Sequence, residues 1–281
     1  MLMGSVFNPE KNKNYLGTSA EWESLFLSFS APEEPKDLGS FLNIAERGLR
    51  YKTKDYPPGV FEDNVRKHAA RLVTRLLLFK WDELPVLLDR GKLERLFWIH
   101  DIPELGVLLD GTEGYVRDAT SVEKETDAML ANKVKESEKD IAGKIFSEKD
   151  FRLFILYDGA GDLLKGKEFN HVDPEALVAY LLDKVDGNTF FHFFLSRWID
   201  SDRFDAGFQI RPDSLDYTMK QADRFMTNLE KIKDGHNGLY VLCRQIIYKQ
   251  LEFVRNVWGK VEKKQRIPLF IKNSSVLDET T

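Results

Sequence analysis

The chain is poor in cysteine: Cys243 is the single one among 281 residues. A lone cysteine cannot form an internal disulfide, and it cannot supply the several thiolates of a cysteine-rich zinc site. Both kinds of framework are therefore excluded. Cys243 lies within LYVLCRQIIYKQL, where apolar residues recur at helical spacing, and we interpret it as a core residue.

Long apolar runs are absent as well. The first residues, MLMGSVFNPEKNKNY, contain no apolar stretch of the length found in signal peptides. No other segment combines the length and the uninterrupted hydrophobicity needed to cross a bilayer. We therefore expect a cytoplasmic protein that has no membrane among its partners.

Positive charge is not in excess, because 41 Lys and Arg residues stand against 46 Asp and Glu residues, giving a net charge of −5. Surfaces that bind nucleic acids concentrate Lys and Arg against many phosphates, so we expect no such surface here. A local basic pocket remains compatible with this balance. Its best candidate is ERGLRYKTKD, which places Arg47 and Arg50 before a loop. The alternative is an ordinary solvated surface.

Apolar and aromatic side chains are abundant, at 42% and 12% of the residues, which is enough for a full hydrophobic core. Apolar residues recur every three or four positions in several long segments, a pattern typical of amphipathic helices. These segments are 65–77, 93–99, 215–232 and 239–258. Because we find no repeat and no convincing series of strands, the sequence predicts an all-α fold.

Capping residues predict where several helices begin. Thr18 or Ser19 precedes AEWESLFLSF, and Ser147 precedes EKDFRLFILY. Asp173 and Pro174 supply a cap and a first-turn proline for the most apolar segment, which ends in FFHFFLSRWI. We expect this helix to be central.

We expect one domain made of four consecutive parts. Residues 1–45 form a lead-in and a helix that packs on the core, and residues 46–200 form a metal-binding helical domain. Residues 201–265 form C-terminal helices packed on the same domain, and residues 266–281 form a tail.

Three separated places on the expected helices could supply ligands to one metal ion. They are His68, the adjacent pair His100 and Asp101, and one of the two acids Asp183 and Asp186. A hydrolytic metal site needs imidazoles and carboxylates that converge on one ion and leave positions open for water and substrate. All these residues lie on helices with apolar faces, where an unpaired charge is costly to bury. Taken singly, each also fits an ordinary residue at the edge of a core.

The order of these residues, with the motifs around them, resembles the HD-domain phosphohydrolases. The motifs are N-V-x-x-H from Asn64, H-D-x-x-E from His100, a charged helix with TDAM, and E-A followed by D-K-V-D from Glu175. The closest likeness is to the 5′-deoxynucleotidase branch of that family. It covers roughly residues 47–198 and leaves the C-terminal helices unexplained.

The resemblance implies an HD-domain helical bundle that holds one divalent ion of manganese, cobalt, magnesium, iron or zinc. The implied ligands are His68, His100, Asp101 and Asp183. Asp186 is the alternative to Asp183, because Phe190 and Phe191 follow it with the apolar spacing that the family usually shows after its last ligand. Pro103 cannot donate the next helical hydrogen bond, so we expect the helix that delivers His100 to kink or stop there.

The resemblance also implies catalytic roles. Glu104 matches the acid that positions or activates water, and Asp110 approximates a second acid, one residue farther from His100 than in the closest relatives. Arg50 is the best match for a phosphate-binding arginine, followed by Arg47. The implied activity is hydrolysis of a nucleotide phosphate ester, most closely the release of phosphate from a (deoxy)nucleoside monophosphate.

Two other functions remain open at this point. One is a regulatory nucleotide-binding module that keeps the metal and the pocket without turnover, and the other is a metal-free helical interaction protein. His171 and His236 fit loops, and His192 fits a core or an interface, so we do not expect a second ion. The apolar run FFHFFLSRW leaves room for a homodimer.

Overall fold

The computed structural model describes residues 13–48, 63–106, 128–167, 171–200 and 213–265. Within these ranges the chain forms nine α-helices joined by short 3-10 turns and loops, and it contains no strand, which confirms the predicted all-α fold. No helix in the described part is long and apolar enough to span a bilayer. The α-helices are α1 (Ser19–Leu27), α2 (Gly39–Ala45), α3 (Val65–Arg75), α4 (Arg90–Ile99), α7 (Ala128–Ile145), α8 (Glu148–Leu164), α9 (Pro174–Asp200), α10 (Asp213–Leu229) and α11 (Asn237–Gln265). The 3-10 turns are η1 (Lys36–Leu38), η3 (Leu76–Leu78), η4 (Trp81–Glu83), η5 (Ile102–Leu105) and η6 (Glu230–Ile232).

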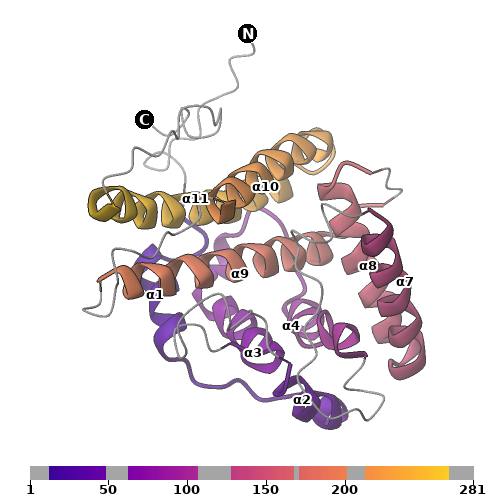
Figure 1. Cartoon of the computed structure of the whole chain (residues 1–281). Coiled ribbons are helices and arrows are strands. Elements are labelled where there is room, and N and C mark those ends of the chain that lie inside the picture. Colours follow the sequence, from indigo (N-terminus) through magenta and orange to yellow (C-terminus); the bar gives the residue numbers. More distant parts are fainter. Residues whose placement is uncertain (1–12, 49–62, 107–127, 168–170, 201–212, 266–281) are drawn as a thin grey trace.

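Helix α9 is the central element (Figure 1). It contacts α11 along its length and also packs against α1, α3, α4 and α8. In Figure 1, α10 and α11 lie on one side of it, with α3 and α4 on the other and α7 and α8 beside its beginning. The sequence explains this position, because residues 176–182 are all buried, and a helix that is apolar all round belongs in a core.

The helices begin where their capping residues predict. Thr18, rather than Ser19, caps α1: its hydroxyl accepts a hydrogen bond from the Glu21 N–H. In turn, the Glu21 carboxylate accepts a hydrogen bond from the Thr18 N–H. Ser147 caps α8. Asp173 accepts a hydrogen bond from the Ala176 N–H at 2.9 Å and thereby caps α9.

Helix α4 ends at Ile99, and His100 is its C-terminal cap. The chain continues as η5, with Pro103 within its first turn. This confirms that the helix stops before Pro103, whose missing N–H cannot continue the α-helical ladder. As a consequence, Glu104 does not follow His100 on the same helix but lies on η5, where its N–H donates to the Asp101 carbonyl at 3.2 Å.

Buried side chains of the described residues form two large clusters and a small third one of Ala45, Val65 and Leu105. The larger cluster joins α1, α3, α4, α8 and the first half of α9 to residues of α10 and α11, including Phe225 and the fully buried Cys243. The second large cluster is rich in aromatic residues and joins α1 to the second halves of α9 and α11. The helices after residue 212 therefore pack on the same core as the helices that carry the proposed ligands.

Candidate metal centre

Four side chains from three segments meet in the interior. They are His68 on α3, His100 and Asp101 at the end of α4, and Asp183 on α9. Each offers one nitrogen or oxygen atom, these atoms lie within 4.8 Å of one another, and all four residues are buried. The structure thus brings together residues that are separated by more than a hundred positions in the sequence.

The distances between these donor atoms suit a single ion. Nε2 of His68 lies 2.9 Å from Oδ1 of Asp183, and Nε2 of His100 lies 3.2 Å from Oδ1 of Asp101. Nε2 of His100 is also 3.6 Å from Oδ1 of Asp183. Ligands that surround a divalent ion at about 2.0–2.2 Å lie about 3 Å from one another, so the four atoms have the spacing of a coordination shell.

The ring of His100 presents Nε2 to this cluster. Its Nδ1 donates to the carbonyl oxygen of Phe97 at 3.0 Å, so Nε2 is the ring nitrogen that faces the carboxylates. Among the described residues, the buried Nε2 has no hydrogen-bond partner of good geometry. A buried nitrogen of this kind, aimed at two carboxylates, is suited to bind a cation.

The ring of His68 lies between two carboxylates. Its Nδ1 is 3.0 Å from Oδ2 of Asp186, and its Nε2 is 2.9 Å from Oδ1 of Asp183. A neutral imidazole has one N–H and can satisfy one of these acceptors. The other contact therefore requires a cation, which is either a second proton on the ring or a metal ion on Nε2.

Asp183 is held by groups on its outer oxygen. Oδ2 accepts a hydrogen bond from the Tyr157 hydroxyl and forms an ion pair with Nζ of Lys184, each at 2.6 Å, so that Oδ1 faces the two histidines. Tyr157 reaches this position because α8 approaches α9 closely one turn later. A Cβ on Gly161 would lie 2.5 Å from the Tyr180 ring, so glycine permits this approach.

The electrostatics of the cluster favour a bound cation. Burial by itself lowers the pKa of His100, but the carboxylates of Asp101 and Asp183 outweigh it and raise that pKa to about 10. Burial by itself raises the pKa of Asp183, but Lys184 and the two histidines hold that pKa well below its usual value. The carboxylate of Asp183 therefore remains charged and stabilises positive charge at the centre.

Asp183 and Asp186, which the sequence left as alternatives, lie on opposite sides of His68. Asp183 faces the cluster, whereas Asp186 binds Nδ1 behind the ring and also accepts hydrogen bonds from Arg71 and Arg75. The group of four mutually close donors contains Asp183 and not Asp186. Asp186 is thus placed to orient His68.

The structure describes two of the four remaining residues expected in the site. Glu104 is half-buried on η5, and its charge contributes to raising the pKa of Lys184. Arg47 is exposed in the turn after α2, next to Gly48, whose carbonyl accepts a hydrogen bond from the Val65 N–H at the start of α3. Arg50 and Asp110 lie outside the described residues.

Lys184 and Tyr157 were not identified from the sequence. Lys184 directly follows Asp183 in the D-K-V-D motif, so the motif itself contained a signal for it. Tyr157 lies on α8 with no motif around it, and only the packing of α8 against α9 reveals its contact with Asp183.

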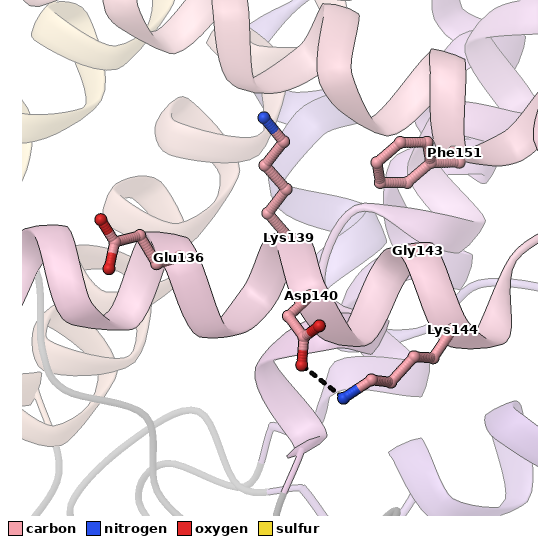
Figure 2. A pocket seen from close by; sticks show the side chains of 6 residues that line it. All are labelled: Glu136, Lys139, Asp140, Gly143, Lys144 and Phe151. Atoms are coloured by element: carbon pink, nitrogen blue, oxygen red, sulfur yellow. Dashed lines mark hydrogen bonds and ion pairs between the residues drawn. The ribbon is translucent and has the colours of Figure 1, made fainter.

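A surface hollow between α7 and α8 is separate from this cluster (Figure 2). Its lining consists of Glu136, Lys139, Asp140, Gly143, Lys144 and Phe151. Asp140 and Lys144 form an exposed ion pair one helical turn apart, an arrangement that contributes little and is common on solvated helices. The hollow is wide open and contains none of the four buried donors, so we assign it no chemical role.

Comparison of the chain with models of protein families, with curated proteins and with solved structures finds no match.

Proposed function

We propose that this protein is a metal-dependent phosphohydrolase of the HD-domain type that acts on a nucleotide phosphate ester. The observation that carries the proposal is the buried meeting of His68, His100, Asp101 and Asp183, with an unpaired imidazole nitrogen directed into it. The reaction that fits best is the release of phosphate from a (deoxy)nucleoside monophosphate.

The donor set fits one divalent ion. Two imidazole nitrogens and two carboxylate oxygens suit manganese, iron, cobalt or zinc, while magnesium more often takes oxygen ligands alone. When bound, such an ion polarises a phosphate oxygen and lowers the pKa of a coordinated water. The protein's own contribution is the fixed geometry of the four donors, because each is buried and three are held from behind by Phe97, Asp186 and Tyr157.

Lys184 is the group we assign to the substrate phosphate. Its Nζ is 2.6 Å from Oδ2 of Asp183, and its side chain as a whole is half-buried, with 28% exposed. A lysine in this place offsets the charge of a phosphate next to the ion. Arg47 and Arg50 are proposed as further phosphate ligands.

Glu104 is the group we assign to the attacking water. Its carboxylate belongs to η5, which begins directly after Asp101 and holds Glu104 by the hydrogen bond from its N–H to the Asp101 carbonyl. A half-buried carboxylate beside the cluster can accept a proton from water as the phosphorus–oxygen bond forms. The leaving group in this scheme is the nucleoside, and Asp110 is proposed as the second acid.

The test is a screen for phosphate release from nucleoside mono- and triphosphates with each of the five metals. We expect turnover with at least one monophosphate, and we expect His100→Ala to lose both bound metal and turnover while the helical circular dichroism is kept. His236→Ala is the matched control, because His236 is exposed and lies away from the cluster. Metal and nucleotide binding without any turnover would instead identify a regulatory module, and turnover retained in His100→Ala would contradict the proposal.

A further inference from the structure

Two buried arginines lie behind His68 on the same helix. Arg71 and Arg75 follow His68 by three and seven positions, so all three side chains project from one face of α3. Arg71 is 2% exposed and Arg75 is fully buried. Fully buried arginines are rare, because the guanidinium must be paired to offset its desolvation.

Both arginines converge on Asp186. Arg71 donates to Oδ2 of Asp186 from Nη2 at 2.7 Å and from Nε at 3.0 Å, and its Nε also lies 3.2 Å from Oδ1. Its Nη1 and Nη2 donate to the two oxygens of Asp63. Nη2 of Arg75 donates to Oδ1 of Asp186. Asp186 is therefore fixed from two directions, and the oxygen that it shares with Arg71 also accepts from Nδ1 of His68.

Aromatic rings enclose the two guanidinium groups. Cζ of Arg75 lies 4.0 Å above the Trp22 ring and 5.3 Å from the Phe26 ring. Cζ of Arg71 lies 4.3 Å above the Phe190 ring. Such contacts stabilise a cation and also restrict its orientation. Trp22 and Phe26 belong to α1, so a helix outside the region that resembles a phosphohydrolase reaches the back of the metal centre.

A contribution to stability does not by itself explain why a buried arginine occupies position 75. Its Nε and Nη1 are buried and have no hydrogen-bond partner, which costs free energy. Asp186 would still be paired with Arg71 and His68 if Arg75 were replaced by an apolar residue of similar length. What such a replacement would remove is the shorter of the two contacts on Oδ1, because the other, from Nε of Arg71, is 3.2 Å long.

We propose that Arg75 is a positioning residue of the metal centre. It fixes Asp186, which in turn holds the His68 ring with Nε2 directed at Asp183, and Trp22 of α1 keeps the guanidinium in place by stacking on it. The inference rests on the metal-binding part of the proposed function and does not depend on hydrolysis.

The first test compares Arg75→Met with Leu76→Ala, a control that creates a cavity beside Arg75 without touching Asp186. The metal-free proteins are titrated with Mn²⁺ by calorimetry, and their unfolding temperatures are measured without metal. We expect Arg75→Met to bind Mn²⁺ about 10- to 100-fold more weakly than the unmodified chain, the usual loss when a group behind a ligand is removed, with an unchanged or higher unfolding temperature. We expect Leu76→Ala to unfold at a lower temperature and to bind Mn²⁺ with little change.

A second pair of variants tests two features of Arg75, its stacking on Trp22 of α1 and its planar guanidinium group. Trp22→Leu removes the ring but keeps apolar bulk, and Arg75→Lys keeps the charge but loses the planar fork. We expect both to bind Mn²⁺ with affinities between those of the unmodified chain and Arg75→Met. The visible spectrum of bound Co²⁺ should change in Arg75→Met and stay unchanged in Leu76→Ala, because it reports ligand geometry.

The outcomes separate the two proposals. Unchanged Mn²⁺ affinity in Arg75→Met, or a loss no larger than that in Leu76→Ala, overturns the positioning role. If the unmodified chain binds Mn²⁺ but releases phosphate from no nucleotide, the proposed hydrolysis fails and the positioning role stands on the titrations. If the unmodified chain binds none of the divalent ions, both are overturned.

Discussion

The hydroxyl of Tyr157 donates a hydrogen bond to Oδ2 of Asp183 at 2.6 Å. This contact joins α8 to α9 and assigns different tasks to the two oxygens of one carboxylate. Oδ2 is occupied by Tyr157 and Lys184, and Oδ1 is left to face His68 and His100. A carboxylate anchored in this way cannot rotate freely, so it presents one defined donor to a metal ion.

Replacing Tyr157 by Phe should therefore weaken metal binding. The ring and its packing remain, and only the hydrogen bond to Asp183 is lost, so we expect Mn²⁺ affinity to fall about tenfold. Calorimetric titration measures this loss. Tyr180→Phe is the matched control, since Tyr180 is a buried neighbour on α9 whose ring, not its hydroxyl, makes the described contacts. Equal losses in the two variants would mean that the hydroxyl of Tyr157 has no special role.

Replacing Lys184 by Met should separate substrate binding from metal binding. The ammonium repels a cation bound nearby, and Tyr157 still holds Oδ2 of Asp183 when Lys184 is replaced, so its removal should leave metal affinity unchanged or higher. If Lys184 binds the phosphate, KM for the nucleotide should rise by about tenfold or more, and turnover should fall as well, because the developing charge loses a fixed cation. Steady-state phosphate release measures both. Lys139→Met on the exposed face of α7 is the control. Identical KM values in the two variants would show that Lys184 does not bind the substrate phosphate.

The helices and the ordered ligand candidates could be predicted from the sequence, because they depend on local signals. Apolar spacing marks α3, α4 and α9, the cap at Asp173 begins α9, and Pro103 ends the helix that delivers His100. These signals require only neighbouring residues. They explain why the prediction of an all-α fold was correct.

The choice between Asp183 and Asp186 could not be made from the sequence. Residues three apart on a helix project about 60° from each other, so both acids reach the neighbourhood of His68. Which one faces the cluster depends on the rotation of α9 relative to α3, and that rotation is set by packing across the core. The same holds for Tyr157 and for the buried pair Arg71 and Arg75, whose partners are distant in the sequence.

Because of the ion pairs of Arg95, the free energy of unfolding should decrease at acidic pH. Arg95 binds Asp150 of α8 and Asp37 of η1 with two hydrogen bonds each, and these bonds hold the pKa of Asp150 below its ordinary value of 3.8. The folded chain therefore binds fewer protons than the unfolded chain near and below pH 3.8. This contribution is present above that pH and is lost as the pH falls through the lower pKa of the folded state.

Arg95→Gln should remove that contribution. We expect the variant to be less stable than the unmodified chain at pH 6 and the two to converge as the pH falls below 3.8, as measured by urea unfolding at each pH. Arg90→Gln is the control, because Arg90 forms an exposed pair with Glu94 on the same helix and should have little effect. A constant difference at all pH values would show that Arg95 acts through packing alone.

His192 should contribute a second pH dependence at higher pH. It is buried in the aromatic cluster of α9, α10 and α11, with its Nδ1 unpaired and its Nε2 3.3 Å from the Thr218 hydroxyl. Burial lowers its pKa from 6.5 to about 3. Between these values the unfolded chain binds a proton that the folded chain does not, so stability falls with decreasing pH by roughly 1.4 kcal/mol per pH unit.

Replacing His192 by Phe removes the titrating group and the unpaired nitrogen while keeping an aromatic ring among Phe191, Phe193 and Trp258. We expect the variant to be as stable as the unmodified chain at pH 8 and more stable at pH 5, because an apolar ring has no proton to take up when the chain unfolds. Urea unfolding at the two pH values measures the difference. His171→Phe controls for the loss of a histidine outside the core, and its stability should follow the pH dependence of the unmodified chain. A parallel response of the unmodified chain and His192→Phe between pH 8 and pH 5 would mean that His192 accepts a proton in the folded state.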